Sequence, residues 1–421
     1  MPKVVKAPQT YQDLGSAPGG PGRKALRLFL GAFGDPGHAF PMLALGAALA
    51  RRGHDVTFES WERWREHALA GGMAFVAAPE YPVFPQRGEA PLKPYEAVVR
   101  AARDTRAHVV ALRPDAVVAD ILTLGPALAG ELESVPVATL IPHVHPDLPR
   151  GAPPYSFGAR LPRTGAGRRL WSALEPVVRR GLEHGKRDLD GARGRLGLPP
   201  VDRVHGGISE RLCLVGTFPQ LEYPRDWPAS THVVGPLLWE PPYDDVAPPP
   251  GEEPLVLIAP STAQDRSHRL LRAALAGLEH EAVRVLATWN RRALPGPQRV
   301  PGNARLVEWI SYARTMPRCA VVVCHVGHGT MVRALASGAT VVACPVAGDM
   351  AENAARLDWA GAGVRLPWRL ATPRGVRLAV RRALAEPALA RRAGELAAWS
   401  RAHDGAERAA ELVEELGRGA R

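Results

Sequence analysis

Short apolar runs alternate with helix-like segments along most of the chain, and this alternation constrains the fold more than any other feature. The first strand-like run covers residues 26–30, and a helical pattern covers residues 39–52, where leucines recur at helical spacing until Gly53. Residues 56–58 form the next strand-like run. A strand, a helix and a second strand within about 30 residues are typical of a parallel sheet, because parallel neighbours need a crossover connection.

The same alternation restarts after a stretch rich in proline and acidic residues at positions 240–254. Strand-like runs beyond it lie at residues 255–259, 283–287, 304–307, 320–324 and 340–344. The pattern predicts an α/β protein with two doubly wound, Rossmann-like domains that face each other across a cleft. The expected divisions are a flexible leader (1–25), a first domain (26–239), a linker (240–254), a second domain (255–400) and a final helix that braces the first domain (401–421).

Composition narrows the class of protein. With 421 residues, 46% of them hydrophobic and 23% charged, the chain is long enough for two or three globular domains. No apolar run reaches the ~18 residues of a membrane-spanning helix, and the first residues lack the apolar stretch of a secretory signal. We therefore expect a cytoplasmic protein without stable membrane insertion.

The net charge is +11, and arginine supplies most of the positive charge. We interpret arginine pairs such as Arg179–Arg180 as parts of solvated helix faces. The alternative is that they attract an anionic ligand or an anionic membrane surface. No dense basic run with interleaved aromatic residues occurs, so we expect no nucleic-acid partner. The four cysteines form no C-x-x-C pair, and we expect buried side chains and no metal site.

A glycine-rich turn follows the strand-like run at residues 320–324. It reads His325-Val-Gly327-His-Gly329-Thr330, and a helical pattern begins at Met331. Glycines let backbone N–H groups approach an anion, the helix N-terminus favours negative charge, and the Thr330 hydroxyl and His325 ring add donors. The turn predicts a phosphate-binding site, with an ordinary tight turn and a structural histidine as the alternative.

A carboxylate follows the next strand-like run. Asp349 stands in the segment Pro345-x-x-x-Asp349-x-x-x-Asn353. Because the carboxyl ends of parallel strands meet at one edge of a sheet, Asp349 should face the same cleft as the phosphate turn. Its two oxygens can accept hydrogen bonds from neighbouring sugar hydroxyls, and a helix N-cap is the alternative.

Together, these two segments resemble the donor signature of the family-one glycosyltransferases, which include plant secondary-product and bacterial antibiotic enzymes. The resemblance extends over residues 26–416 and is most specific in the second half. It implies the GT-B fold and a nucleotide-sugar donor. It further implies a pyrophosphate site at His325, Gly327, Gly329 and Thr330, a donor-sugar site at Asp349, Met350 and Asn353, nucleobase stacking on Trp309, and phosphate contacts from Ser261 and Thr262.

Two positions depart from the plant members of that family. Arg333 stands where they carry a glutamate for the ribose hydroxyls, and Met350 stands where a glutamine follows the aspartate. Both differences weaken the case for UDP-glucose, and a dTDP-sugar, which lacks the 2′-hydroxyl, fits Arg333. The sequence leaves UDP and dTDP as equal alternatives and does not identify the sugar.

Two residues at strand ends in the first half indicate acid–base chemistry. His38 follows the first strand-like run, and Asp120 ends the run at residues 116–120. Imidazole is the natural base for a hydroxyl at neutral pH, and a carboxylate on its far nitrogen would orient it. In the resembled family, such a His–Asp dyad deprotonates the acceptor. The alternatives are a turn cap for His38 and a helix cap for Asp120, with His143 and His145 as substitute bases that lack a carboxylate partner in sequence.

The sequence therefore predicts an inverting, metal-independent glycosyltransferase whose nucleotide-sugar is a co-substrate, without a further cofactor. The expected partner is a small, largely apolar acceptor with a hydroxyl, such as a phenolic or polyketide-like natural product, and the expected state is a monomer or homodimer. The rival interpretations are a lipid-intermediate transferase at the membrane and a catalytically silent GT-B protein that binds a nucleotide. Aromatic residues that either line an acceptor pocket or form satellite core are Tyr81, Phe84, Tyr95, Tyr155, Phe157 and Trp171.

Overall fold

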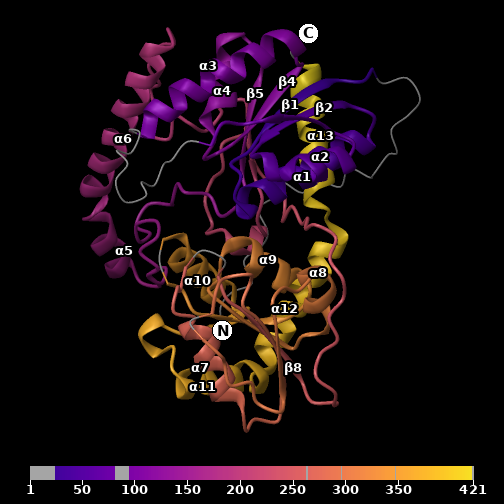
Figure 1. Ribbon diagram of the computed structural model, residues 1–421. Helices are drawn as coiled ribbons and strands as arrows, with labels where there is room; N and C mark the ends of the chain where they lie inside the picture. The colour runs from indigo at the N-terminus through magenta and orange to yellow at the C-terminus, as the bar shows by residue number, and fades with distance from the viewer. Residues whose placement is uncertain (1–23, 81–93, 262–263, 295, 347, 420–421) are drawn as a thin grey trace.

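Two parallel sheets organise the molecule, one in each half of the chain (Figure 1). The computed structural model describes residues 24–80, 94–261, 264–294, 296–346 and 348–419. The strand order is β3-β2-β1-β4-β5-β6-β7 in the first sheet and β10-β9-β8-β11-β12-β13 in the second. Every recorded strand pairing is parallel, which confirms the expectation from the alternating pattern.

The strands are short and close to their expected positions. They are β1 (Arg27–Gly31), β2 (Asp55–Ser60), β3 (Ala74–Ala77), β4 (Ala116–Asp120), β5 (Val137–Ile141), β6 (Leu212–Val215), β7 (Thr231–Val233), β8 (Leu255–Ala259), β9 (Arg284–Thr288), β10 (Ala304–Val307), β11 (Val321–Cys324), β12 (Thr340–Ala343) and β13 (Gly363–Arg365). Every residue of β4, β5 and β8 is buried, because helices cover both faces of a parallel sheet.

The helices connect these strands. They are α1 (Pro36–Arg51), α2 (Arg65–Ala70), α3 (Pro94–Leu112), α4 (Leu124–Leu132), α5 (Gly165–Ser172), α6 (Glu175–Arg195), α7 (Arg269–Leu278), α8 (Tyr312–Thr315), α9 (His328–Ala336), α10 (Asp349–Ala360), α11 (Pro373–Ala385), α12 (Pro387–Ala402) and α13 (Gly405–Arg418). Within the described ranges, no helix combines the length and the apolar character needed to cross a bilayer.

Each sheet has a point at which its strand order reverses direction. In the first sheet this point lies between β1 and β4, and in the second it lies between β8 and β11. Loops that leave the carboxyl ends of two such strands diverge to opposite faces of the sheet and open a crevice, where ligands bind in doubly wound folds. The residues that follow β1, β4, β8 and β11 are therefore the first candidates for a functional site.

The last helix of the chain returns to the first sheet. Figure 1 shows α13 beside β1, β2 and α1 at the opposite end of the molecule from α7 and α11. Its Ala409, Ala410 and Val413 are buried in the apolar cluster that also holds Leu28 and Leu45. The expected leader falls mostly on residues 1–23, which lie outside the described residues.

A charged contact secures this return. Glu414 of α13 accepts hydrogen bonds from the Arg52 side chain at 2.5 Å and from His54 Nε2 at 3.0 Å. Burial alone would raise the pKa of Glu414, but these two partners and Arg418 lower it to about 2. The carboxylate is therefore ionised at neutral pH, and it ties α13 to the segment between α1 and β2.

Candidate active site

His38 and Asp120 meet at the switch point of the first sheet. His38 lies in the first turn of α1, immediately after the loop that leaves β1, and Asp120 is the last residue of β4. The distance between His38 Nδ1 and Asp120 Oδ1 is 2.7 Å. Because a carboxylate only accepts, Nδ1 carries the proton, and the lone pair of a neutral ring lies on Nε2.

The carboxylate of Asp120 is itself held in place. Its other oxygen accepts a hydrogen bond from the Phe33 backbone N–H at 3.3 Å, and its side chain has no exposed surface. Burial alone would lower the pKa of His38, but the charge and hydrogen bond of Asp120 outweigh this and raise the pKa above its usual value. Asp349 of the second domain adds to this rise, so the two domains place these groups within electrostatic reach of each other.

The other two candidate bases have different surroundings. The ring of His143 lies edge-on to that of His38, with centroids 6.1 Å apart, and its Nδ1 donates to the Val144 carbonyl at 2.8 Å. Burial lowers the pKa of His143, and it lowers the pKa of His145 to about 3. No recorded ion pair joins either ring to a carboxylate among the described residues, so His38 has the surroundings that best suit a base.

The predicted phosphate turn lies at the switch point of the second sheet. Gly327 is the N-cap of α9, and the backbone of Val326 before it has φ of +58°. A positive φ is costly for a β-branched residue, and such strain is found where a backbone must take a particular path around a ligand. Added Cβ atoms at Gly327 and Gly329 would meet no atom within 4 Å, so space is open beside the turn.

His325 makes one hydrogen bond to the loop after β8 and one longer contact with a carboxylate. Nδ1 accepts the Ser261 backbone N–H at 2.9 Å, and Nε2 lies 3.5 Å from Asp265 Oδ2. Nε2 is buried and has no recorded hydrogen-bond partner among the described residues, and its contact with a pyrophosphate stays a prediction. The structure adds that His325 fixes the loop after β8 against the end of β11.

Asp265 was not identified from the sequence. It accepts the backbone N–H groups of Arg269 and Leu270 at the start of α7, at 2.9 and 3.0 Å. Burial alone would raise its pKa, but the His325 ring and these two N–H groups lower the pKa below its usual value. An aspartate four residues before a helix was the available signal, because side chains of this kind cap helix starts.

The predicted donor-sugar residues begin α10. Gly348 is the N-cap with φ of +59°, and Asp349 is the first helical residue, exposed to solvent. The alternative that Asp349 is the N-cap is therefore wrong. Asn353 is fully buried, and its amide donates to the Val326 carbonyl at 3.1 Å, so it joins α10 to the phosphate turn. Met350 is half-buried against the apolar cluster of the second domain.

Two of the remaining candidate residues, Trp309 and Arg333, contact the linker. Trp309 is half-buried, with Tyr243 edge-on at 5.4 Å and the Arg291 guanidinium 5.0 Å from its centroid. Arg333 donates to the Trp239 carbonyl at 2.7 Å and lies 3.9 Å from Glu240. Thr330 is half-buried at the start of α9, and Thr262 lies outside the described residues.

A buried ion network across the two domains was also missed. Arg356 of α10 is fully buried and donates to Glu352 at 2.7 Å and to Glu222 of the first domain at 3.1 Å. Its guanidinium carbon lies 3.6 Å from the ring centroid of Tyr223. Glu222 also accepts the backbone N–H of His145 at 2.6 Å. The network therefore links the donor-sugar helix to the loop that carries His143.

Comparison with known proteins shows which class of enzyme this chain resembles. Residues 269–416 match the family model "Erythromycin biosynthesis protein CIII-like, C-terminal domain". The chain is 29% identical to 4'-demethylrebeccamycin synthase of Lentzea aerocolonigenes, over 90% of this chain and 97% of that protein. It is 28% identical to O-mycaminosyltylonolide 6-deoxyallosyltransferase of Streptomyces fradiae, over 93% and 97% of the two chains.

The fold is also similar to that of solved structures. A crystal structure of the glycotransferase of kitacinnamycin superposes with a TM-score of 0.75 at 21% identity, over 94% of this chain and 100% of that chain. The chain is a GT-B glycosyltransferase. In this glycosyltransferase, the His38–Asp120 pair and the predicted phosphate turn lie at the switch points of the two sheets.

Proposed function

We propose that this glycosyltransferase moves a sugar from a UDP- or dTDP-sugar to a hydroxyl of a small, largely apolar acceptor, with inversion at the anomeric carbon. The observation that carries the proposal is the 2.7 Å pair of His38 and Asp120. With Nδ1 held by Asp120, Nε2 accepts the proton of the acceptor hydroxyl. Such a base contributes roughly 10²–10⁴-fold to the rate.

The rest of the step follows from the charges in the cleft. As His38 takes the proton, the acceptor oxygen attacks the anomeric carbon from the face opposite the diphosphate, through an oxocarbenium-like state. Asp120 stabilises the imidazolium that forms. The N–H groups at the start of α9 and the Thr330 hydroxyl offset the charge that grows on the departing diphosphate, so the step needs no metal ion.

Two kinds of support favour these substrates. A neighbouring structure, VinC (TM-score 0.66, 19% identity), was crystallised with dTDP, and SpnG (0.63, 21%) was crystallised with the spinosyn aglycone. In this chain, the exposed Asp349 at the start of α10 offers two free carboxylate oxygens near His38. Vicinal hydroxyls of a sugar match such an acceptor pair.

The test is transfer measured by mass spectrometry. Purified protein is supplied with UDP-glucose or dTDP-glucose and a panel of phenolic and polyketide acceptors, with EDTA present. We expect a glycoside whose anomeric configuration is inverted, and a loss of roughly 10²–10⁴-fold in His38→Ala. His280→Ala is the matched control, because His280 is exposed at the far end of the second domain. Full transfer by His38→Ala would refute the role of His38, and donor binding without any product would favour the catalytically silent alternative.

A further inference from the structure

One segment of the first domain has an unusual surface. The three most exposed large apolar side chains in the described part of the chain all lie between residues 157 and 177. They are Phe157 (66% exposed), Leu170 (69%) and Val177 (71%). Leu174 is a further exposed residue of the same segment. Isolated apolar residues are normal on a protein surface, but a group of this kind marks a contact site.

Arginines accompany these apolar residues. Arg163, Arg168, Arg169, Arg179 and Arg180 are all exposed, and no recorded hydrogen bond or ion pair joins their guanidinium groups to another described residue. Some exposed arginines elsewhere on the surface have close carboxylate partners, such as Arg318 with Asp245 at 2.6 Å. Residues 163–180 contain these five arginines and only Glu175 as an acid, so their net charge is +4.

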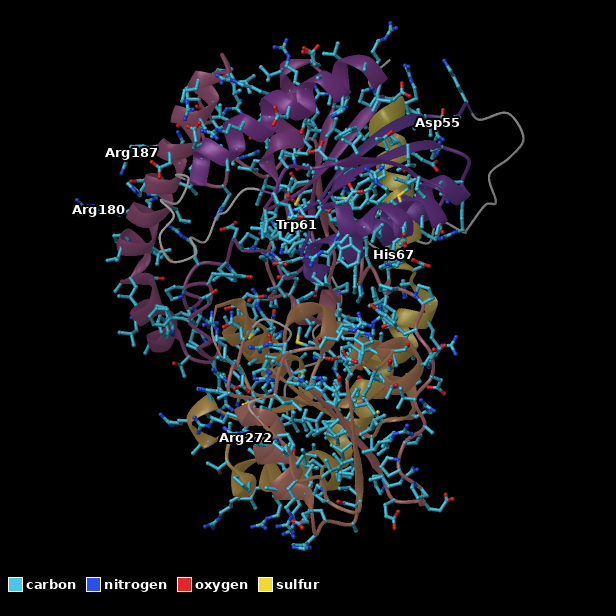
Figure 2. The ribbon with its side chains drawn as sticks, viewed as in Figure 1. Asp55, Trp61, His67, Arg180, Arg187 and Arg272 are labelled. Atoms are coloured by element: carbon cyan, nitrogen blue, oxygen red, sulfur yellow. The ribbon has the colours of Figure 1, made fainter. Side chains whose placement is uncertain are left out.

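The two kinds of residue share one ridge. Leu170, Leu174 and Val177 are spaced by four and three residues across α5 and the start of α6, so they form one stripe. The buried residues of α6 lie near its far end, at Leu189, Ala192 and Arg193, and α5 has none. Figure 1 shows α5 and α6 along one flank of the molecule, and Figure 2 shows Arg180 and Arg187 at its outer edge, away from the body.

We propose that α5 and the first half of α6 form a docking surface for an anionic lipid bilayer, with the stripe of Leu170, Leu174 and Val177 facing the membrane. A helical ridge with an apolar stripe and flanking cations matches a helix that lies in the bilayer interface. Arginine stems extend along apolar surface while their heads reach the phosphate groups of lipids. Five uncompensated cations give attraction to anionic lipids and none to neutral ones.

The charge argues against a second copy of the chain as the occupant. A two-fold dimer formed through this stripe would place the same arginines against each other, since both partners present the same surface. By the same helical spacing, Arg169 and Arg180 flank the stripe, whereas Arg168 and Arg179 lie on the side of the helices away from it.

The same segment contacts α10. Gly158, next to Phe157, contacts α10 so closely that a Cβ atom there would lie 2.9 Å from the Ala351 carbonyl oxygen. Arg160 pairs with Asp358 of the same helix at 2.7 Å. Docking would thus hold α10, which begins at Asp349, near the bilayer. The benefit of this placement for an apolar, lipid-dissolved acceptor rests on the proposed function, whereas the docking itself does not.

The test is co-sedimentation with vesicles. We expect the protein to bind vesicles of equimolar phosphatidylglycerol and phosphatidylcholine, and not vesicles of phosphatidylcholine alone. Val177→Asp and the double variant Arg169→Glu/Arg180→Glu should each weaken binding by roughly ten-fold or more, because each arginine near an anionic surface strengthens binding by about a factor of five to ten. Salt at about 1 M, where the Debye length is about 3 Å, should release the protein.

Two control variants make the result specific. Leu378→Asp replaces an exposed leucine of α11, and Arg272→Glu reverses an exposed arginine of α7, which Figure 2 shows on the opposite domain. Both should bind vesicles like the wild type, and all variants should keep the wild-type melting temperature. Absence of binding to anionic vesicles, or equal losses in the controls, would overturn the proposal. So would a dimer in gel filtration that Val177→Asp dissociates, because the stripe would then be a protein interface. Vesicle binding needs no turnover, so this result is independent of the transfer assay.

Discussion

Replacement of Arg356 by methionine should destabilise the protein more than any surface substitution. Arg356 is fully buried between two carboxylates, with Glu352 at 2.7 Å and Glu222 at 3.1 Å. Methionine keeps an apolar stem against Tyr223 but removes the cation. Glu352 then loses its recorded partner in a buried position, and Glu222 keeps only Arg225 at 3.3 Å as a cation.

The magnitude follows from the cost of an uncompensated buried charge. Removal of one partner from a buried ion pair costs about 3–5 kcal/mol, because the remaining charge has neither water nor a counter-ion. For a domain of 150–250 residues, each kcal/mol lowers the melting temperature by roughly 2–4 °C. We therefore expect Arg356→Met to melt roughly 6–20 °C below the wild type.

Thermal and urea denaturation of four proteins would check this. They are the wild type, Arg356→Met, Glu352→Gln and the double variant. Glu352→Gln should reduce the cost of Arg356→Met, since the uncompensated carboxylate is then gone, and the difference gives their coupling energy. Arg318→Met is the matched control, because its pair with Asp245 is exposed and exposed pairs contribute little.

A refuting result is equally clear. If Arg356→Met unfolds at the wild-type temperature, or if Glu352→Gln leaves its cost unchanged, the network is not what stabilises the contact between α10 and the first domain.

Three further outcomes test other parts of the structure. In a pH–rate profile, the rate of transfer should fall as pH drops through the raised pKa of His38, since only the neutral ring accepts a proton. In Asp120→Asn, this acidic fall in rate should occur at lower pH, and the rate at neutral pH should be lower than in the wild type. Glu414→Gln should have a lower melting temperature than the wild type at pH 7. This difference in melting temperature should shrink as pH falls from about 4.5 toward the pKa of about 2, where the carboxylate of Glu414 loses its charge. An equal difference at all pH values would contradict the ion contact with Arg52. Asp349→Ala should raise KM for the donor and leave the melting temperature unchanged, because the side chain is exposed; an unchanged KM would remove Asp349 from the donor site.

The sequence predicted the architecture and the positions of several candidate-site residues, because both depend on local pattern. Alternation of strand-like and helix-like segments is a property of neighbouring residues, and it requires parallel sheets once crossovers of this length separate the strands. The glycine turn at residues 325–330 and the carboxylate at 349 are likewise local, since strand, turn and helix follow one another in the chain. Their placement at the carboxyl ends of strands follows from the fold class.

Only the tertiary structure decided which side chains meet. His38 and Asp120 are 82 positions apart, and the 2.7 Å contact depends on the pairing of β1 with β4. The contacts of His325 with Ser261 and of Arg356 with Glu222 span 64 and 134 positions. The sequence placed Arg179–Arg180 on a solvated helix face but set no bounds for α5 or α6, and it could not show that their apolar residues face outward. Direction and register of a side chain are set by what packs around it, and no local pattern carries that information.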